Sequence, residues 1–130
     1  MAKIIIIEDD LKVAEVYKKR LEEDGHEVLI SEDIQAVGQI KSQKPNLVLL
    51  DILMPKISGM TILRELKSDP DLEEIPVLIL TNVEGTNELS QAVELGASAY
   101  LVKADINLDI LSAKVKEVLE SEAIATGVRG

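Results

Sequence analysis

The sequence predicts an α/β protein in which a five-stranded parallel sheet is doubly wound by five helices. Short apolar runs recur along the chain, and a longer segment with helical periodicity separates each run from the next. Parallel strands need crossover connections, and right-handed crossovers place helices on both faces of a sheet. The chain has 130 residues, which fits one domain of this kind.

The strands are expected where aliphatic runs end in a polar residue or a turn. These runs are residues 4–7, 28–30, 47–50, 77–80 and 100–102. The third run, "LVLL", is typical of a strand that is buried on both faces. Met54, Pro55 and Gly59 prevent that strand from continuing beyond Asp51.

The helices are predicted from the spacing of apolar residues and from stop signals. The first spans residues 10–24, because its apolar residues, Tyr17 among them, share one face and Gly25 is a good C-terminal stop. The next three are expected at residues 34–44, 59–67 and 87–95, and the fifth is marked by Leu111, Val115, Val118 and Leu119. We expect residues 1–122 to form the domain and residues 123–130 a flexible C-terminal tail.

The composition excludes several classes of function. With 24 acidic and 14 basic residues the formal net charge is −10, which disfavours direct binding to nucleic acids or anionic membranes. The absence of cysteine excludes disulfides, thiolate catalysis and thiolate zinc sites. Because the sequence has neither a spanning apolar run nor a secretory signal, we expect a soluble cytoplasmic protein.

A polar residue follows each predicted strand; the second strand contributes only Ser31, and the other four contribute the candidate site residues. They are Glu8, Asp9 and Asp10 after the first, Asp51 after the third, Thr81 after the fourth and Lys103 after the fifth. The carboxyl ends of parallel strands meet at one edge of a sheet, so the acids should converge there. Carboxylates that lie close together repel one another unless a cation intervenes. Oxygen ligands of this kind suit Mg²⁺, which favours phosphate partners.

These residue types together predict a phosphoryl-transfer site. Lys103 adds a positive charge opposite the acids, and Thr81 adds a hydroxyl donor. Catalysis at such a site is mostly positioning and charge neutralisation. Asp51 is the candidate nucleophile, because it comes from the middle of the sheet, between the metal-binding acids and the other two groups.

Four segments resemble the receiver domain of bacterial two-component response regulators over about residues 3–120. They are "IIIIEDD", "LVLLDILMPKISG", "VLILTN" and "GASAYLVKA". The resemblance implies a flavodoxin-like strand order, 2-1-3-4-5, and implies that Asp51 accepts a phosphoryl group from a sensor histidine kinase or phosphotransfer protein. It also implies that Asp9, Asp51 and the Leu53 carbonyl bind Mg²⁺ with help from Glu8, and that Thr81 and Lys103 bind phosphoryl oxygens.

Three further residues have alternative interpretations. Tyr100 is either a core aromatic of the fifth strand or, by resemblance, a switch residue that turns inward when Thr81 moves. In the second case the face built by the fourth helix, fifth strand and fifth helix would dock a downstream protein. Dimerising receivers carry an acidic pair before this tyrosine, so we expect a monomer here. Asp10 is expected to cap the first helix rather than to contact a metal, and His26, which has no second His or Cys beside it, to lie in a solvated loop.

Two departures from the family pattern leave a second function open. Ala104 stands where the family has proline, and Asn82 stands where it favours a very small residue. Both favour a pseudo-receiver, a docking module that is not phosphorylated, whereas the intact acids, Thr81 and Lys103 favour a phosphoacceptor. A haloacid dehalogenase phosphatase would have a second aspartate at Leu53. The chain also lacks glycine-rich nucleotide-binding motifs.

The lifetime of a phosphorylated Asp51 can also be predicted. In this family two positions flank the path of an attacking water, and here they are Leu53 and Val83, neither of which can orient a water. The domain would catalyse its own phosphorylation. Its self-dephosphorylation, by contrast, would be slow. We expect 130 residues to leave no room for an output domain. Whether the protein acts alone or belongs to a longer regulator stays open at this point.

Overall fold

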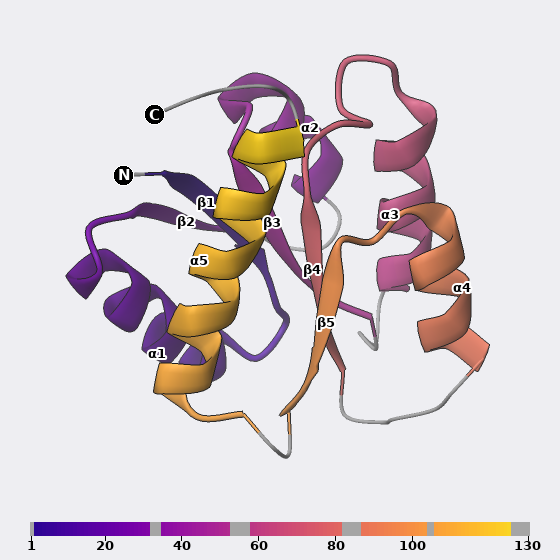
Figure 1. Ribbon diagram of the computed structural model, residues 1–130. Coiled ribbons are helices and arrows are strands. Elements are labelled where there is room, and N and C mark those ends of the chain that lie inside the picture. Colours follow the sequence, from indigo (N-terminus) through magenta and orange to yellow (C-terminus); the bar gives the residue numbers. More distant parts are fainter. Residues whose placement is uncertain (1, 32–34, 53–57, 82–86, 104–105, 126–130) are drawn as a thin grey trace.

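The computed structural model describes residues 2–31, 35–52, 58–81, 87–103 and 106–125 (Figure 1). It confirms the predicted fold, since five parallel strands form one sheet in the order β2-β1-β3-β4-β5. The strands are β1 (Lys3–Ile7), β2 (Glu27–Ser31), β3 (Leu47–Asp51), β4 (Val77–Thr81) and β5 (Ala99–Val102). The helices are α1 (Leu11–Glu23), α2 (Ala36–Gln43), α3 (Gly59–Ser68), α4 (Asn87–Leu95) and α5 (Leu108–Ala125).

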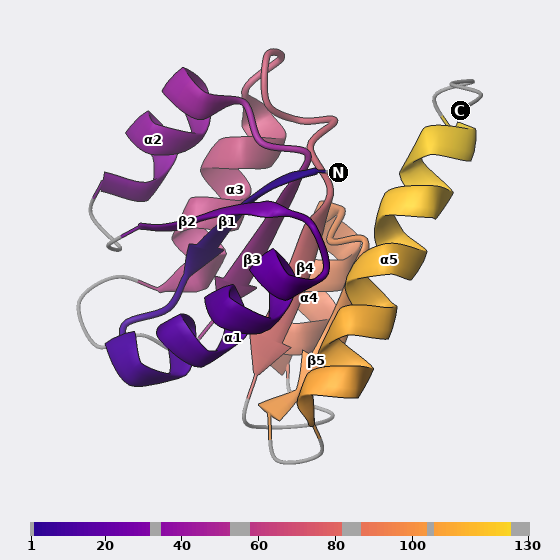
Figure 2. The same cartoon turned by 90° about the vertical axis from the view of Figure 1, so that its left-hand side faces the viewer.

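Helices cover both faces of the sheet (Figures 1 and 2). Helices α1 and α5 pack on one face, whereas α2, α3 and α4 pack on the other. Successive side chains of a strand point to opposite faces. Accordingly, Ile4 and Ile6 of β1 join the α1/α5 side, and Ile5 and Ile7 join the other side. Both faces of the central strands are therefore buried, which explains why these strands are uniformly aliphatic.

The strand register places the predicted functional residues at one edge. Ile7 pairs with Leu50, so Glu8 and Asp51 follow paired positions on neighbouring strands. Thr81 pairs with Val102, so Lys103 emerges just beyond Thr81. The sheet thereby gathers residues that are far apart in the sequence.

The helix ends follow their local sequence signals. The Asp10 carboxylate accepts hydrogen bonds from the backbone N–H groups of Lys12 and Val13, which confirms the predicted cap. Gly25 and Gly96 have φ angles of 99° and 111°, which side chains rarely tolerate. Gly25 follows α1 as predicted, and Gly96 follows α4 in the same way.

Two boundaries and one residue differ from the sequence-based expectation. Helix α2 begins at Ala36, whereas the sequence predicted a start at residue 34. Residue 34 lies outside the described residues. Helix α5 continues to Ala125, into the segment expected as a tail, and the division at residue 122 stays a prediction. His26 lies in the loop between α1 and β2 as expected, but it is partly buried, and its Nδ1 accepts a hydrogen bond from the Ala2 backbone N–H at 3.3 Å.

No helix among the described residues combines the length and apolar character needed to cross a membrane.

Candidate functional site

Three carboxylates meet at the carboxyl edge of β1 and β3. One oxygen each of Glu8, Asp9 and Asp51 lies within 4.8 Å of the others. Glu8 and Asp51 are buried, whereas Asp9 is exposed. The predicted convergence of these acids is therefore confirmed. The exposed Asp9 lies on the side from which an ion or a phosphoryl group can approach.

Lys103 joins two of these acids. Its Nζ donates hydrogen bonds to Glu8 Oε2 at 2.7 Å and to Asp51 Oδ2 at 3.2 Å. Since β4 and β3 lie between β5 and β1, the side chain of Lys103 extends across the ends of both strands to reach Glu8. Only 15% of the Lys103 side chain is exposed, so this contact is largely screened from water.

Burial controls the electrostatics of this cluster. It raises the pKa of Glu8 to about 7, and the neighbouring Asp51 acts in the same direction while Lys103 opposes it. Burial alone would lower the pKa of Lys103, but hydrogen bonding to Glu8 and the charge of Asp51 outweigh it and raise that pKa. Lys103 is therefore a stable ammonium at neutral pH. It neutralises only part of the negative charge of three acids.

The donor set fits Mg²⁺. Every candidate ligand atom in the cluster is a hard carboxylate oxygen. Mg²⁺ is commonly held by one or two protein carboxylates and keeps several waters, so a partly open cluster suits it. Lys103 contacts both Glu8 and Asp51, so the exposed Asp9 is the most available ligand of the three. The Leu53 carbonyl, expected as a further ligand, lies outside the described residues.

Gly59 fixes the backbone beneath Asp51. Its N–H donates to the Ile52 carbonyl at 2.8 Å. A Cβ at Gly59 would overlap the Asp51 carbonyl oxygen and would lie 2.7 Å from the Ile52 Cα. Helix α3 therefore starts directly against the end of β3, where Ser58 caps it by accepting from the Met60 N–H. From the sequence, Gly59 was expected only to mark the end of β3 and the start of the third helix. A glycine in the first turn of a helix was the signal for this close approach.

The other residues predicted from the sequence lie outside the acidic cluster or outside the described residues. Thr81 is buried at the end of β4, beside the strand of Asp51. Tyr100 is 46% exposed, so the interpretation of it as a core aromatic is wrong, and its role as a switch stays a prediction. Asn82, Val83 and Ala104 lie outside the described residues, as does the Lys103–Ala104 peptide.

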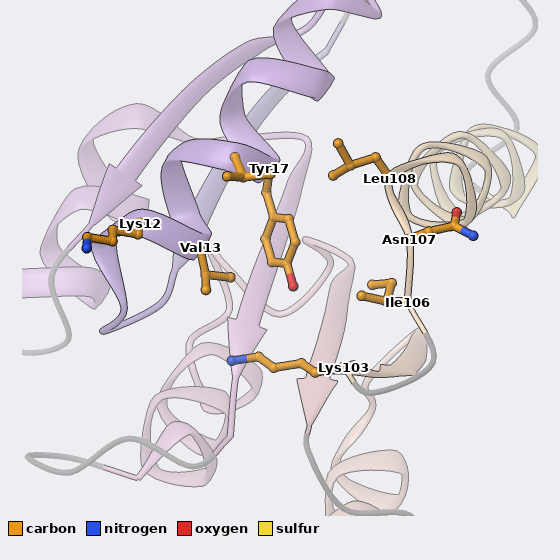
Figure 3. Close-up of a pocket in the computed structure, with 8 residues that line it drawn as sticks. Lys12, Val13, Tyr17, Lys103, Ile106, Asn107 and Leu108 are labelled. Carbon is orange, nitrogen blue, oxygen red and sulfur yellow. The ribbon is translucent and has the colours of Figure 1, made fainter.

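A cavity of about 440 Å³ lies beside the acidic cluster, between α1 and the start of α5 (Figure 3). Its lining residues are Lys12, Val13, Val16, Tyr17, Lys103, Ile106, Asn107 and Leu108. Lys103 thus contacts the acids through its Nζ and also lines the cavity. Tyr17 was assigned from the sequence only to the apolar face of its helix, and its place beside Lys103 was missed.

Comparison with known proteins agrees with this geometry. The family model described as "Response regulator receiver domain" matches residues 4–123. The chain belongs to this family. It is therefore a receiver domain of two-component signalling, and its Glu8, Asp9 and Asp51 form the acidic pocket expected of a phosphoacceptor site.

Individual relatives support the assignment. The response regulator MprA of Mycobacterium avium is 30% identical over 118 residues, which cover 90% of this chain and 50% of that protein. The receiver domain of a signal transduction histidine kinase from Syntrophus aciditrophicus has 32% identity and a TM-score of 0.83, with 93% of this chain and 92% of that chain covered. A receiver domain protein from Methanospirillum hungatei has 25% identity and a TM-score of 0.87, with 96% and 98% covered. The chain spans about half the length of the curated relatives it matches.

Proposed function

We propose that this receiver domain is a phosphorylation-dependent switch in which Asp51 accepts a phosphoryl group from a sensor histidine kinase or a phosphotransfer protein. The observation that carries the proposal is the position of Asp51 itself. Its carboxylate contacts the Lys103 ammonium at 3.2 Å and lies within 4.8 Å of the Glu8 and Asp9 carboxylates. A nucleophile held between a fixed cation and a metal-binding pair of acids is the arrangement that phosphoryl transfer requires.

The chemical step is an in-line displacement at phosphorus. An oxygen of the Asp51 carboxylate attacks, and a bond forms between this oxygen and phosphorus. The bond from phosphorus to the donor atom breaks, and the leaving group keeps the electron pair and takes up a proton. Lys103 neutralises charge on the phosphoryl oxygens, and the Thr81 hydroxyl donates to one of them. Burial of Asp51 and Lys103 strengthens these interactions.

Asp9 and Asp51 would hold Mg²⁺, with the Leu53 carbonyl as a further ligand and Glu8 assisting. When bound, the ion would neutralise negative charge on the transferring phosphoryl group. The hard-oxygen chemistry of the cluster supports this assignment. Glu8 contributes mainly by its bond to Lys103, which holds the ammonium beside Asp51.

The output of the switch would be a docking face for a downstream protein, formed by α4, β5 and α5. Thr81 lies at the end of β4 and Tyr100 on neighbouring β5, so a shift of Thr81 toward a phosphoryl group can be followed by Tyr100. The half-exposed side chain of Tyr100 can lose contact with water by turning inward. We expect the domain to act as a monomer in this role.

The test is labelling by a small phosphodonor. Acetyl phosphate with Mg²⁺ should add one phosphoryl group to the native chain, and mass spectrometry should locate it on Asp51. Asp51→Asn should fold but remain unlabelled, and Asp9→Asn should lose Mg²⁺ affinity in calorimetry. A phosphoryl group on another residue would contradict the assignment. Complete absence of labelling and of beryllofluoride binding would favour the pseudo-receiver alternative.

Slow self-dephosphorylation is a separate part of the proposal. It rests on the apolar character of Leu53 and Val83, which cannot hydrogen-bond an attacking water. The decay of phospho-Asp51 should be faster when these residues are replaced together, as Leu53→Asn with Val83→Glu. Equal or slower decay in the double variant would refute this part and leave the phosphoacceptor role intact.

A further inference from the structure

Tyr17 brings a hydroxyl to the cavity that borders Lys103. It lies on the buried side of α1, and only 7% of it is exposed. Figure 3 shows its ring extending from α1 and its hydroxyl pointing toward the Lys103 side chain. The other labelled residues on this side of the cavity, Val13 and Ile106, offer no polar side-chain atom, and the Asn107 side chain points away. Tyr17 is thus the polar neighbour of Lys103 on the cavity side.

Among the described residues, two groups accept hydrogen bonds from the Lys103 ammonium, which leaves a third donor for such a neighbour. An ammonium group carries three N–H donors. Glu8 and Asp51 each accept one of them. A phenol oxygen can accept a further hydrogen bond without adding a charge. Burial raises the pKa of Tyr17, with the charge of Lys103 opposing the rise, so the side chain remains a neutral phenol under physiological conditions.

A phosphoryl group on Asp51 changes what Lys103 must do. The added oxygens are new acceptors, so the ammonium must turn toward them and weaken its present bonds. A lysine has a flexible four-carbon stem and a strongly hydrated ammonium. Because the Lys103 side chain also borders an open cavity, it could instead swing into the water there. The site therefore needs a group that holds the ammonium from the cavity side.

We propose that Tyr17 is this positioning residue, and that its hydroxyl accepts a hydrogen bond from Lys103 Nζ when Asp51 carries a phosphoryl group or its analogue. The inference rests on the proposed roles of Asp51 and Lys103. In this role Tyr17 acts through Lys103. Its loss should weaken phosphoryl-analogue binding and leave Mg²⁺ binding unchanged.

Tyr17→Phe is the informative variant, because it removes the hydroxyl and keeps the ring that fills the core. Beryllofluoride affinity in the presence of Mg²⁺ should fall by about tenfold, the effect of losing one hydrogen bond to a charged group. Mg²⁺ affinity measured without beryllofluoride should stay the same. Val16→Ala is the matched control, since it changes the same cavity wall without removing a polar atom. It should alter neither affinity.

A double-mutant cycle distinguishes positioning from packing. In a Lys103→Met background, Tyr17→Phe should cause no further loss in the rate of labelling by acetyl phosphate. The chain has two tyrosines, so ring-labelled tyrosine gives a simple carbon NMR spectrum in which Tyr17→Phe assigns the signal. That signal should move when beryllofluoride binds the native protein and should not move in Lys103→Met.

These experiments distinguish a failure of the role of Tyr17 from a failure of the phosphoacceptor role of Asp51. Equal beryllofluoride affinity in the native protein and Tyr17→Phe would overturn the inference while the proposed function stands. So would an equal loss in the Lys103→Met background, since Tyr17 would then act by packing. If the native protein neither binds beryllofluoride nor is labelled, the proposed function fails and the inference falls with it.

Discussion

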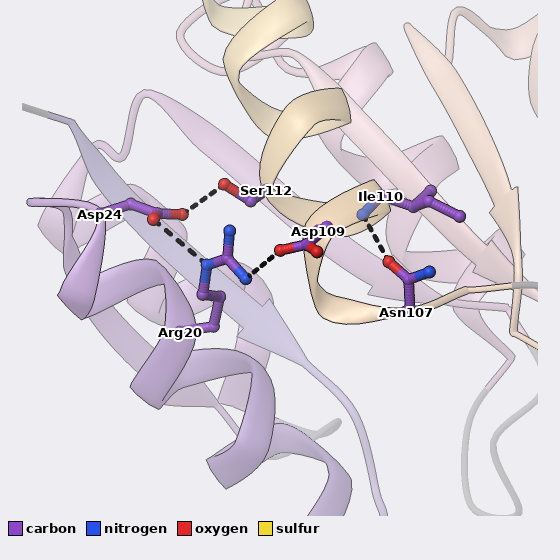
Figure 4. Close-up of polar contacts among 6 residues, drawn as sticks. All are labelled: Arg20, Asp24, Asn107, Asp109, Ile110 and Ser112. Atoms are coloured by element: carbon purple, nitrogen blue, oxygen red, sulfur yellow. Dashed lines mark hydrogen bonds and ion pairs between the residues drawn. The ribbon is translucent and has the colours of Figure 1, made fainter.

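Two clusters in this molecule place a cation between two carboxylates at the same distances but in different surroundings. Lys103 lies 2.7 Å from Glu8 and 3.2 Å from Asp51. On the surface between α1 and α5, Arg20 lies 2.7 Å from Asp109 and 3.2 Å from Asp24 (Figure 4). The Glu8 side chain is 2% exposed, whereas the Asp109 side chain is 87% exposed. Exposure to water is the largest difference between the two clusters.

The comparison indicates that burial, rather than the contact distance, determines the direction in which the pKa of an ion-paired carboxyl group shifts. Burial raises the pKa of Glu8 to about 7, although an ammonium contacts it. The pKa of Asp24 is lowered instead, chiefly by a hydrogen bond from the Ser112 hydroxyl and further by Arg20. Near the surface water screens the charges, so such pairs contribute little. The buried cluster stores unfavourable charge that a metal ion or phosphoryl chemistry can use, and the surface cluster only joins two helices.

Lys103→Met should produce the largest effect. The substitution keeps an apolar stem of similar length but leaves Glu8 and Asp51 buried beside each other without a cation. Removing one partner of a buried ion pair costs about 3 kcal/mol or more in the free energy of unfolding. Urea denaturation near neutral pH measures this loss. Added Mg²⁺ should restore part of the stability, because it also neutralises the acids.

A stability equal to that of the native protein in the absence of Mg²⁺ would contradict the comparison. It would mean that the two acids relieve their repulsion by protonation or by contact with water. The Lys103→Arg variant is the control, because it retains the positive charge and changes only the shape of the head group.

Gly59→Ala should have the second largest effect. The backbone below the buried cluster is as constrained as its side chains, because a Cβ at this position overlaps the Asp51 carbonyl. Backbone atoms cannot move aside cheaply, so overpacking should cost about 2 kcal/mol of unfolding free energy. It should also slow labelling of Asp51 by acetyl phosphate. Gly38→Ala is the control within α2, since nothing lies within 4 Å of a Cβ there, and it should not be destabilising. Equal stability of the two variants would show that α3 can move away from β3.

The sequence predicted the fold and the central residues of the site because both depend on simple geometry. Aliphatic runs separated by amphipathic segments require a parallel sheet, and the first polar residue after each strand must then lie at one edge. Glu8, Asp9, Asp51 and Lys103 converge for that reason. The strand order itself came from the family resemblance, since the run pattern alone does not specify which strands are neighbours.

What the sequence did not predict depends on contacts between side chains of distant segments. Helical periodicity places Tyr17 on the apolar face of α1 but does not indicate which residue its hydroxyl faces. Lys103 is 86 positions further along the chain, so no local pattern links the two residues. The bond between Arg20 and Asp109 has the same character. His26 was assigned to a solvated loop, because no local signal indicates that the Ala2 N–H reaches its ring.

Arg20→Met is the surface counterpart of Lys103→Met, with the same kind of substitution at the same contact distances. Asp24 and Asp109 remain in contact with water, which solvates their charges after the cation is removed. In Lys103→Met, by contrast, Glu8 and Asp51 are left without a cation in the protein interior. The urea midpoint should change far less than for Lys103→Met. The remaining difference from the native protein should disappear in about 1 M salt, which screens exposed charges. A loss comparable to that of Lys103→Met would refute the claim that burial separates the two clusters.

Ser112→Ala should have the smallest effect, and this effect should depend on pH. The Ser112 hydroxyl donates to Asp24 Oδ2 at 2.6 Å, and this bond is the main reason that the pKa of Asp24 lies below its usual value of 3.8. A carboxyl group with a lowered pKa in the folded state stabilises the protein above its unfolded pKa, and this contribution is lost as the pH falls through the folded pKa.

The variant should therefore be slightly less stable than the native protein near neutral pH, and the difference should vanish as the pH falls through the folded pKa of Asp24, which lies below 3.8. Carbon NMR of the Asp24 carboxyl group should show its pKa moving up toward 3.8 in the variant. Glu8 provides the internal reference, because its pKa should be the same in both proteins and shifted in the opposite direction. If the pKa of Asp24 does not change, Arg20 rather than Ser112 holds that carboxylate ionised. The surface cluster would then resemble the buried one in depending mainly on its cation.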